Sequence, residues 1–141
     1  MFRILIAVDG SESSDRAVSH LVGLLGWYKE KPEVHLLNVQ HALPEAVGRF
    51  VAQDQLRDYH REQGDAAVVS ARRALDVAKV PYAIHIGVGE PAHVIAHYAK
   101  EKGIDQIVMG TRGLGTVAGL VMGSVTTHVL SLTGIPVLLV K

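Results

Sequence analysis

Three glycines and a serine in the last third of the chain have a spacing typical of phosphate sites. Two residues separate Gly110 from Gly113, nine separate Gly113 from Gly123, and Ser124 follows directly. An apolar, strand-like segment ends at Gly110, so the glycines surround an expected connection from a strand to a helix. Glycine lets backbone N–H groups approach an anion, and we expect Ser124 to be the N-cap of the next helix. The pattern predicts a phosphate site; the alternative is that the glycines only permit tight turns.

The composition excludes several classes of protein. With 141 residues, of which 48% are hydrophobic and 20% charged, the chain is predicted to form a single domain over residues 1–141. Fourteen Lys and Arg balance fourteen Asp and Glu without a basic cluster, so we expect no nucleic-acid partner. The chain has no cysteine, which rules out disulfides and thiolate chemistry. Its first apolar run ends at Asp9 and is too short for a signal or membrane segment. We expect a cytoplasmic protein without a membrane partner.

Apolar runs of strand length alternate with segments of helical periodicity, which is typical of repeated βαβ units. Strands are expected at 2–8, 34–39, 82–88, 105–109 and 135–140, and helices at 11–27, 56–78, 91–103 and 124–132, with 41–57 the least regular stretch. Ser11 is expected to cap the first of these helices. The prediction is an α/β fold of the Rossmann type, in which helices cover both faces of an open five-stranded parallel sheet. Its strand order is 3-2-1-4-5, which makes the first and fourth strands neighbours.

Asp9 ends the first predicted strand and Gly110 ends the fourth, so both lie where the winding of the sheet reverses. Ligands of open parallel sheets bind at this point. A carboxylate would repel a phosphate, so we expect Asp9 to accept hydrogen bonds from a sugar hydroxyl or a base edge. A phosphate at one end and a polar acceptor at the other describe a nucleotide.

At these residues the chain resembles the universal stress protein family. The similar segments are 4–11, 34–39, 87–92 and 105–115, and the glycine spacing matches the family's G-x2-G-x9-G-[ST] motif. The resemblance implies a fold like that of the adenine nucleotide alpha hydrolases. It also implies ATP as the ligand, and a magnesium ion could be carried in with ATP.

The resemblance further implies roles for individual residues. Asp9 and the backbone of Val39 would serve the adenosine, next to Ala7 and Val8, and Met109 and Gly110 would line the ribose. Gly113, Gly123, Ser124 and Val125 would hold the phosphates, with Arg112 as the cation close to them. A homodimer through the last strand, Pro136 to Val140, is implied as well.

One segment departs from the family pattern. Residues 114–122 between the glycines are uncharged and strongly apolar, whereas many relatives carry basic residues there. Fewer charge-assisted bonds to phosphate predict that ADP or AMP competes well with ATP. The segment is expected to fold over the ligand or to contact another subunit.

Histidines offer further hypotheses of lower weight. His93 and His97 are four residues apart on one helix, and we interpret them as solvated surface residues, since a third metal ligand is not near in sequence. His35 and His85 could be neighbours across two strands, but two histidines do not make a complete metal site. Ser124 with His128 could suggest a nucleophile and a base, but the pattern favours a capping serine.

Three functions remain open from the sequence. The first is a nucleotide-binding stress or regulatory protein that acts through its conformation or assembly. The second is an enzyme that uses the same cleft, either a slow ATPase or a nucleotide-transferring activity. The third is a protein-interaction module in which the glycines are structural. No residue qualifies as a general base near the terminal phosphate, which favours binding over catalysis.

Overall fold

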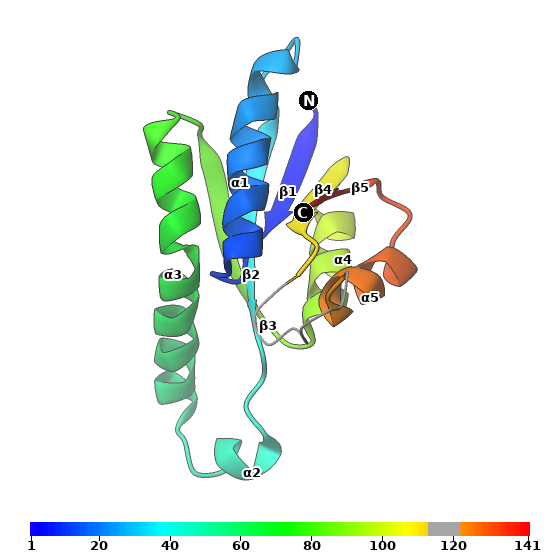
Figure 1. Ribbon diagram of the computed structural model, residues 1–141. Coiled ribbons are helices and arrows are strands. Elements are labelled where there is room, and N and C mark those ends of the chain that lie inside the picture. The colour runs from blue at the N-terminus through cyan, green and yellow to red at the C-terminus, as the bar shows by residue number, and fades with distance from the viewer. Residues whose placement is uncertain (113–121) are drawn as a thin grey trace.

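The computed structural model describes residues 1–112 and 122–141. Within them, five parallel strands form one sheet, as Figure 1 shows. Its order, β3-β2-β1-β4-β5, confirms the predicted order. The strands are β1 (Arg3–Ala7), β2 (Glu33–Gln40), β3 (Tyr82–Val88), β4 (Gln106–Gly110) and β5 (Val137–Val140).

Helices cover both faces of the sheet (Figure 1). One face packs against α1 (Glu12–Leu24) and α3 (Gln53–Val77), and the other packs against α4 (Pro91–Glu101) and α5 (Ser124–Leu132). A 3-10 turn, η1 (Leu25–Trp27), extends α1, and the short α2 (Glu45–Gly48) precedes α3. The first predicted helix is therefore divided, α3 begins three residues earlier than expected, and β5 begins two residues later.

The apolar residues of β1 are buried on both sides of the sheet. Ile4 and Ile6 join the core beneath α1 and α3, whereas Leu5 joins the core beneath α4 and α5. All three are completely buried. This explains the continuous apolar run in the sequence, because a central parallel strand has no solvent-facing side.

The helix starts differ in how they are capped. Ser11 accepts a hydrogen bond from the Ser14 amide at 3.2 Å and so caps α1, as predicted. The prediction that Ser124 is the N-cap of α5 is wrong, because Gly123 holds that position. Gly123 has extended backbone angles, and its carbonyl accepts the first helical bond, from Thr127, at 3.2 Å. Ser124 is therefore the first helical residue.

Among the helices that the structure describes, none combines the length and apolar character needed to cross a membrane.

Candidate functional site

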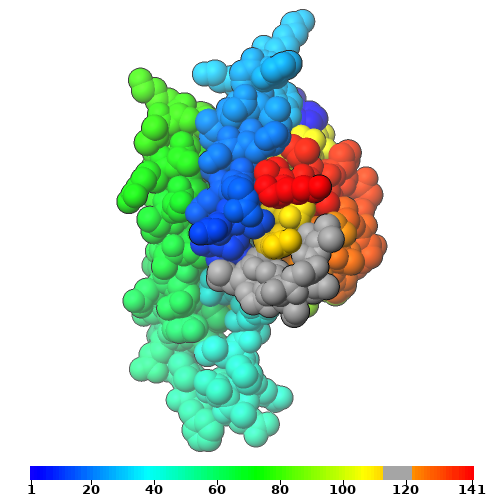
Figure 2. Space-filling model, viewed as in Figure 1, coloured from blue at the N-terminus to red at the C-terminus, as the bar shows by residue number. Residues whose placement is uncertain are grey.

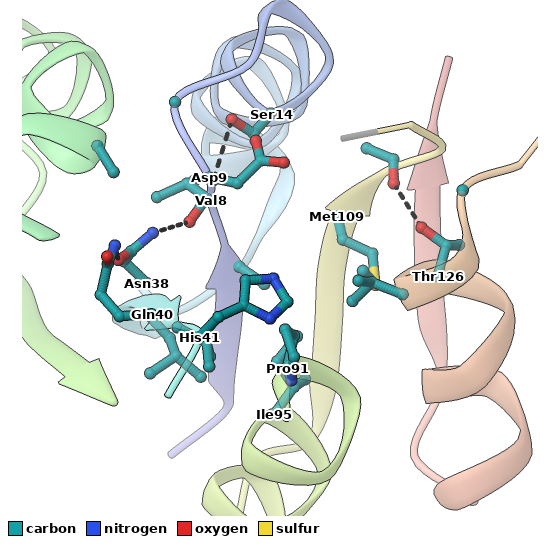
Figure 3. Close-up of a pocket in the computed structure, with 18 of the residues that line it drawn as sticks. Val8, Asp9, Ser14, Asn38, Gln40, His41, Pro91, Ile95, Met109 and Thr126 are labelled. Atoms are coloured by element: carbon teal, nitrogen blue, oxygen red, sulfur yellow. Dashed lines mark hydrogen bonds between the residues drawn. The ribbon is translucent and has the colours of Figure 1, made fainter. Parts of the chain in front are cut away.

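A cavity of about 550 Å³ opens at the carboxyl ends of β1 and β4. Strand β2, helix α3 and the N-terminal parts of α4 and α5 complete its wall (Figure 3). The volume lies within the usual range for small-molecule sites, and the position is the reversal point of the sheet. The predicted site residues that line it are Ala7, Val8, Asp9, Val39, Met109, Gly110, Arg112, Gly123, Ser124 and Val125. Gly113 and residues 114–121 lie outside the described residues.

Asp9 is held in the turn between β1 and α1. Its Oδ1 accepts a hydrogen bond from the Ser11 amide at 2.9 Å, and its own amide donates to Ser14 Oγ at 3.4 Å. Figure 3 shows this group at one side of the cavity, across from Met109 of β4. The local bonds fix the position of the carboxylate before any ligand arrives.

Asn38 is a site residue that the sequence reasoning missed. It is almost completely buried, its Nδ2 donates to the carbonyl of Val8 at 2.8 Å, and its Oδ1 accepts from Gln40 Nε2 at 2.7 Å (Figure 3). The bond to Val8 ties the end of β2 to the end of β1, and the bond from Gln40 within β2 holds the amide in position. A polar residue inside the apolar run 34–39 was the available signal, since a buried amide needs partners.

Gly110 brings β4 against α1 at the edge of the cavity. A Cβ atom at this position would lie 2.2 Å from Ser13 Oγ and 2.7 Å from the Ser13 carbonyl oxygen. Ser13 Oγ also accepts a hydrogen bond from the Arg112 amide at 3.2 Å. This glycine is therefore required for packing, independently of any ligand.

The start of α5 differs from the starts of α1 and α4. Ser11 caps α1 and the Glu90 carboxylate caps α4, whereas Gly123 has no side chain with which to cap α5. Thr126, which the sequence reasoning also missed, anchors this turn by donating from Oγ1 to the Gly110 carbonyl at 3.0 Å. The first amides of α5 thus border the cavity at the positive end of a helix dipole, where an anion is stabilised.

Charged side chains are few around the cavity. In the described part of its lining, Arg112 is the one Arg or Lys and Asp9 is the one carboxylate. An anion bound at α5 would depend mainly on backbone amides.

The comparisons with known proteins identify the family. The model of the universal stress protein family matches residues 1–141. The chain belongs to the universal stress protein family. Universal stress protein YxiE of Bacillus subtilis is 31% identical to it, over 99% of this chain and 98% of that one.

Solved structures agree with this assignment. Protein MJ0577 of Methanocaldococcus jannaschii is 28% identical, covers 99% of this chain and 95% of its own, and gives a TM-score of 0.83. A universal stress protein solved in complex with cAMP is 27% identical, with coverages of 99% and 97% and a TM-score of 0.69. More distant proteins of the same fold were solved with AMP, from Arabidopsis thaliana, and with dAMP, from Archaeoglobus fulgidus.

In this universal stress protein, His35 and His85 meet through a tyrosine. His35 is paired in register with Ala83, so the two histidines are diagonal neighbours. His35 Nδ1 lies 2.8 Å from the Tyr98 hydroxyl, and the His85 ring stacks on the Tyr98 ring. His35 Nε2 lies 2.7 Å from Glu33, and this hydrogen bond is the main cause that lowers the pKa of Glu33. Burial raises the pKa of Tyr98.

His93 and His97 are both exposed and do not share a partner. His97 approaches Glu101 at 3.5 Å, whereas the His93 ring contacts Glu90 and the ring of His128. The side-chain hydrogen bond from His93, followed by its backbone amide, lowers the pKa of Glu90 to about 2. His128 approaches the same carboxylate at 3.4 Å, so its ring is directed toward Glu90.

Proposed function

We propose that this universal stress protein binds an adenine nucleotide in the cavity, and that occupancy alters its conformation or its assembly. The observation that carries the proposal is the polarity of the cavity. An uncapped helix start lies at one end and the Asp9 carboxylate at the other, with mostly apolar residues between them. A nucleotide has the matching order of phosphate, sugar and base.

The phosphate end would be built from backbone amides. Gly123, Ser124 and Val125 supply the start of α5, and the exposed Ser124 hydroxyl can donate a further hydrogen bond. Arg112 supplies the one guanidinium of the described lining. Gly113 joins this set by its place in the sequence motif. Such a site has little fixed positive charge, so we expect AMP and ADP to compete well with ATP.

The adenosine end would use the strand ends. Asp9 can accept from a ribose hydroxyl or a base edge, and the backbone of Val39 can bond the base. Ala7, Val8 and Met109 offer apolar area to a flat ring, with Gly110 beside the ribose. Magnesium would enter with ATP and bind chiefly to its phosphates.

The primary test is the nucleotide itself. The protein is purified without added ligand, and retained nucleotide is identified by absorbance and mass spectrometry. Calorimetric titration of the nucleotide-free protein then compares ATP, ADP and AMP. Absence of both retained nucleotide and measurable binding would refute the proposal and favour a structural role for the glycines. Release of phosphate from added ATP would instead indicate a hydrolase.

Two substitutions test the direction of the ligand. Asp9→Ala is expected to weaken the binding free energy of ATP, ADP and AMP alike by about 1.5–3 kcal/mol, because all three share the adenosine contacts. Asp9→Asn is the matched control, since it keeps an oxygen that can accept from the Ser11 amide. Loss of magnesium ATP binding with AMP binding spared would mean that the carboxylate binds a metal at the phosphates.

Ser124→Ala is expected to weaken the binding of ATP more than the binding of AMP, because it removes a hydrogen-bond donor at the phosphate end. Ser131→Ala is the control on the same helix, since its hydroxyl donates to the His128 carbonyl at 2.7 Å. Equal effects of Ser124→Ala on ATP and AMP would place the phosphates elsewhere.

We also propose assembly through the last strand. β5 is an edge of the sheet, its residues are half-buried, and it reaches the surface beside α1 in Figure 2. An apolar edge strand is usually covered, and antiparallel pairing of Pro136 to Val140 with a second copy would cover it. Sedimentation is expected to show a dimer at micromolar concentration. A monomer both with and without ATP would refute this assembly.

A further inference from the structure

Glu90, His93 and His128 bring three metal-binding side chains to one place. Glu90 ends the link from β3 and caps α4, His93 lies in the first turn of α4, and His128 lies in the middle of α5. One donor atom from each of the three lies within 4.8 Å of the others. The cluster therefore joins two helices that pack against each other on one face of the sheet.

The carboxylate at the centre of this cluster is held in position. Its Oε2 accepts from the His93 amide at 2.9 Å, and its Oε1 accepts from the Ala92 amide at 3.3 Å. The Nδ1 atom of His93 contacts Oε2, and the Nδ1 atom of His128 lies 3.4 Å from Oε1. The two imidazoles thus approach opposite oxygens of one carboxylate. Their rings are nearly perpendicular, at 87°, with centroids 5.0 Å apart.

We propose that Glu90, His93 and His128 bind a divalent transition-metal ion of the zinc class, with water as the fourth ligand. Tetrahedral zinc places its ligand atoms about 3.3 Å apart, given bonds of about 2.0–2.2 Å. The separation of His128 Nδ1 from Glu90 Oε1 already matches this value. His93 Nδ1 lies closer to Glu90 Oε2 than this value, so these two atoms would separate around an ion, and their side chains have room to rotate because they are 63% and 49% exposed.

The donor set selects the kind of cation. Two imidazole nitrogens and one carboxylate suit zinc, nickel or copper, whereas magnesium and calcium require more oxygen ligands. A divalent ion binds both rings in their neutral form.

The test is zinc binding by the full chain after removal of metal with a chelator. Nucleotide is left out, because phosphates themselves bind zinc, so this result is independent of the proposed nucleotide site. Zinc is titrated in competition with a chromophoric chelator. We expect one zinc ion per chain with micromolar affinity, weakened at least about tenfold by His93→Gln or His128→Gln. Magnesium at the same concentrations is expected not to compete.

His97→Gln is the matched control, because it removes one histidine from the same helix without touching the cluster. It is expected to leave zinc affinity unchanged. Equal affinity of all variants, equal loss in His97→Gln, or no binding by the unchanged protein would overturn the proposal. Circular dichroism verifies that each variant is folded.

Thermal unfolding gives a second readout. An ion that bridges α4 and α5 stabilises the native state, so zinc is expected to raise the melting temperature of the unchanged protein and of His97→Gln. At the same zinc concentration the rise should be smaller in His128→Gln, because this variant keeps Glu90 and His93 but binds the ion more weakly. A rise of equal size in His128→Gln would show that zinc binds elsewhere.

Discussion

Replacing Gly110 with alanine tests whether this glycine is required for the fold rather than for a ligand. The new Cβ would lie 2.2 Å from Ser13 Oγ, 2.7 Å from the Ser13 carbonyl oxygen and 2.8 Å from its carbonyl carbon. Two of these atoms belong to the backbone of α1, so rotation of a side chain cannot relieve the contact. Either β4 or the start of α1 has to move.

The expected cost has two parts. Overpacking of a well-packed interior costs about 1–3 kcal/mol. Displacement of Ser13 Oγ also removes the hydrogen bond that it accepts from the Arg112 amide, which adds about 1 kcal/mol. The free energy of unfolding should therefore fall by about 2–4 kcal/mol, and the melting temperature by roughly 10 °C for a chain of this length.

Urea and thermal denaturation of nucleotide-free protein measure this effect without any contribution from a ligand. Gly134→Ala is the matched control, because a Cβ there would meet nothing within 4 Å. A Gly110→Ala variant that melts within about 2 °C of the unchanged protein would refute the packing argument. Gly110 would then be left with the role in ribose binding that the resemblance implied.

Three further predictions concern parts of the fold away from the cavity. Tyr98→Phe leaves His35 Nδ1 without its buried partner and should lower the free energy of unfolding by about 1–3 kcal/mol; an unchanged urea midpoint would contradict this. Because the native pKa of Glu33 lies below its ordinary 4.5, its stabilising contribution should be complete above pH 4.5 and be lost as the pH falls through the native value. Carbon NMR titration of the Glu33 carboxyl should show this, and His35→Phe should move the pKa back up. Gly64→Ala should lower the free energy of unfolding, although alanine favours helices, because the new Cβ would lie 2.6 Å from a side-chain atom of Ile86. This loss should be smaller in an Ile86→Ala background, and purely additive losses in the double variant would refute the contact.

The sequence alone was sufficient to predict the sheet, its strand order and the place of the cavity. The short apolar run at residues 2–8 and the alternation at residues 82–88 favour strands by their length and bounds, and crossovers between parallel strands have one hand. Asp9 and Gly110 each end a strand, so the order of the sheet brought them to one edge. These conclusions need only short-range periodicity and general rules of topology.

The start of α5 shows where local reasoning reached its limit. Serine is a common N-cap, yet the helix begins one residue earlier than that preference predicts, with Gly123 in the capping position. Thr126 holds this turn against the Gly110 carbonyl, sixteen residues away. This contact between two elements fixes the first turn of α5 against the end of β4, and it is not visible in the local sequence.

Only the tertiary structure decided the contacts between residues far apart in the chain. Asn38 bonds to the end of β1, Gly110 packs against Ser13, and His128 of α5 reaches Glu90 at the start of α4. Periodicity assigns a residue to a face of its own helix or strand, but the partner on the neighbouring element depends on how the two elements pack. The sequence therefore determined the sheet and the edge at which a ligand would bind, and packing determined the atoms that meet there.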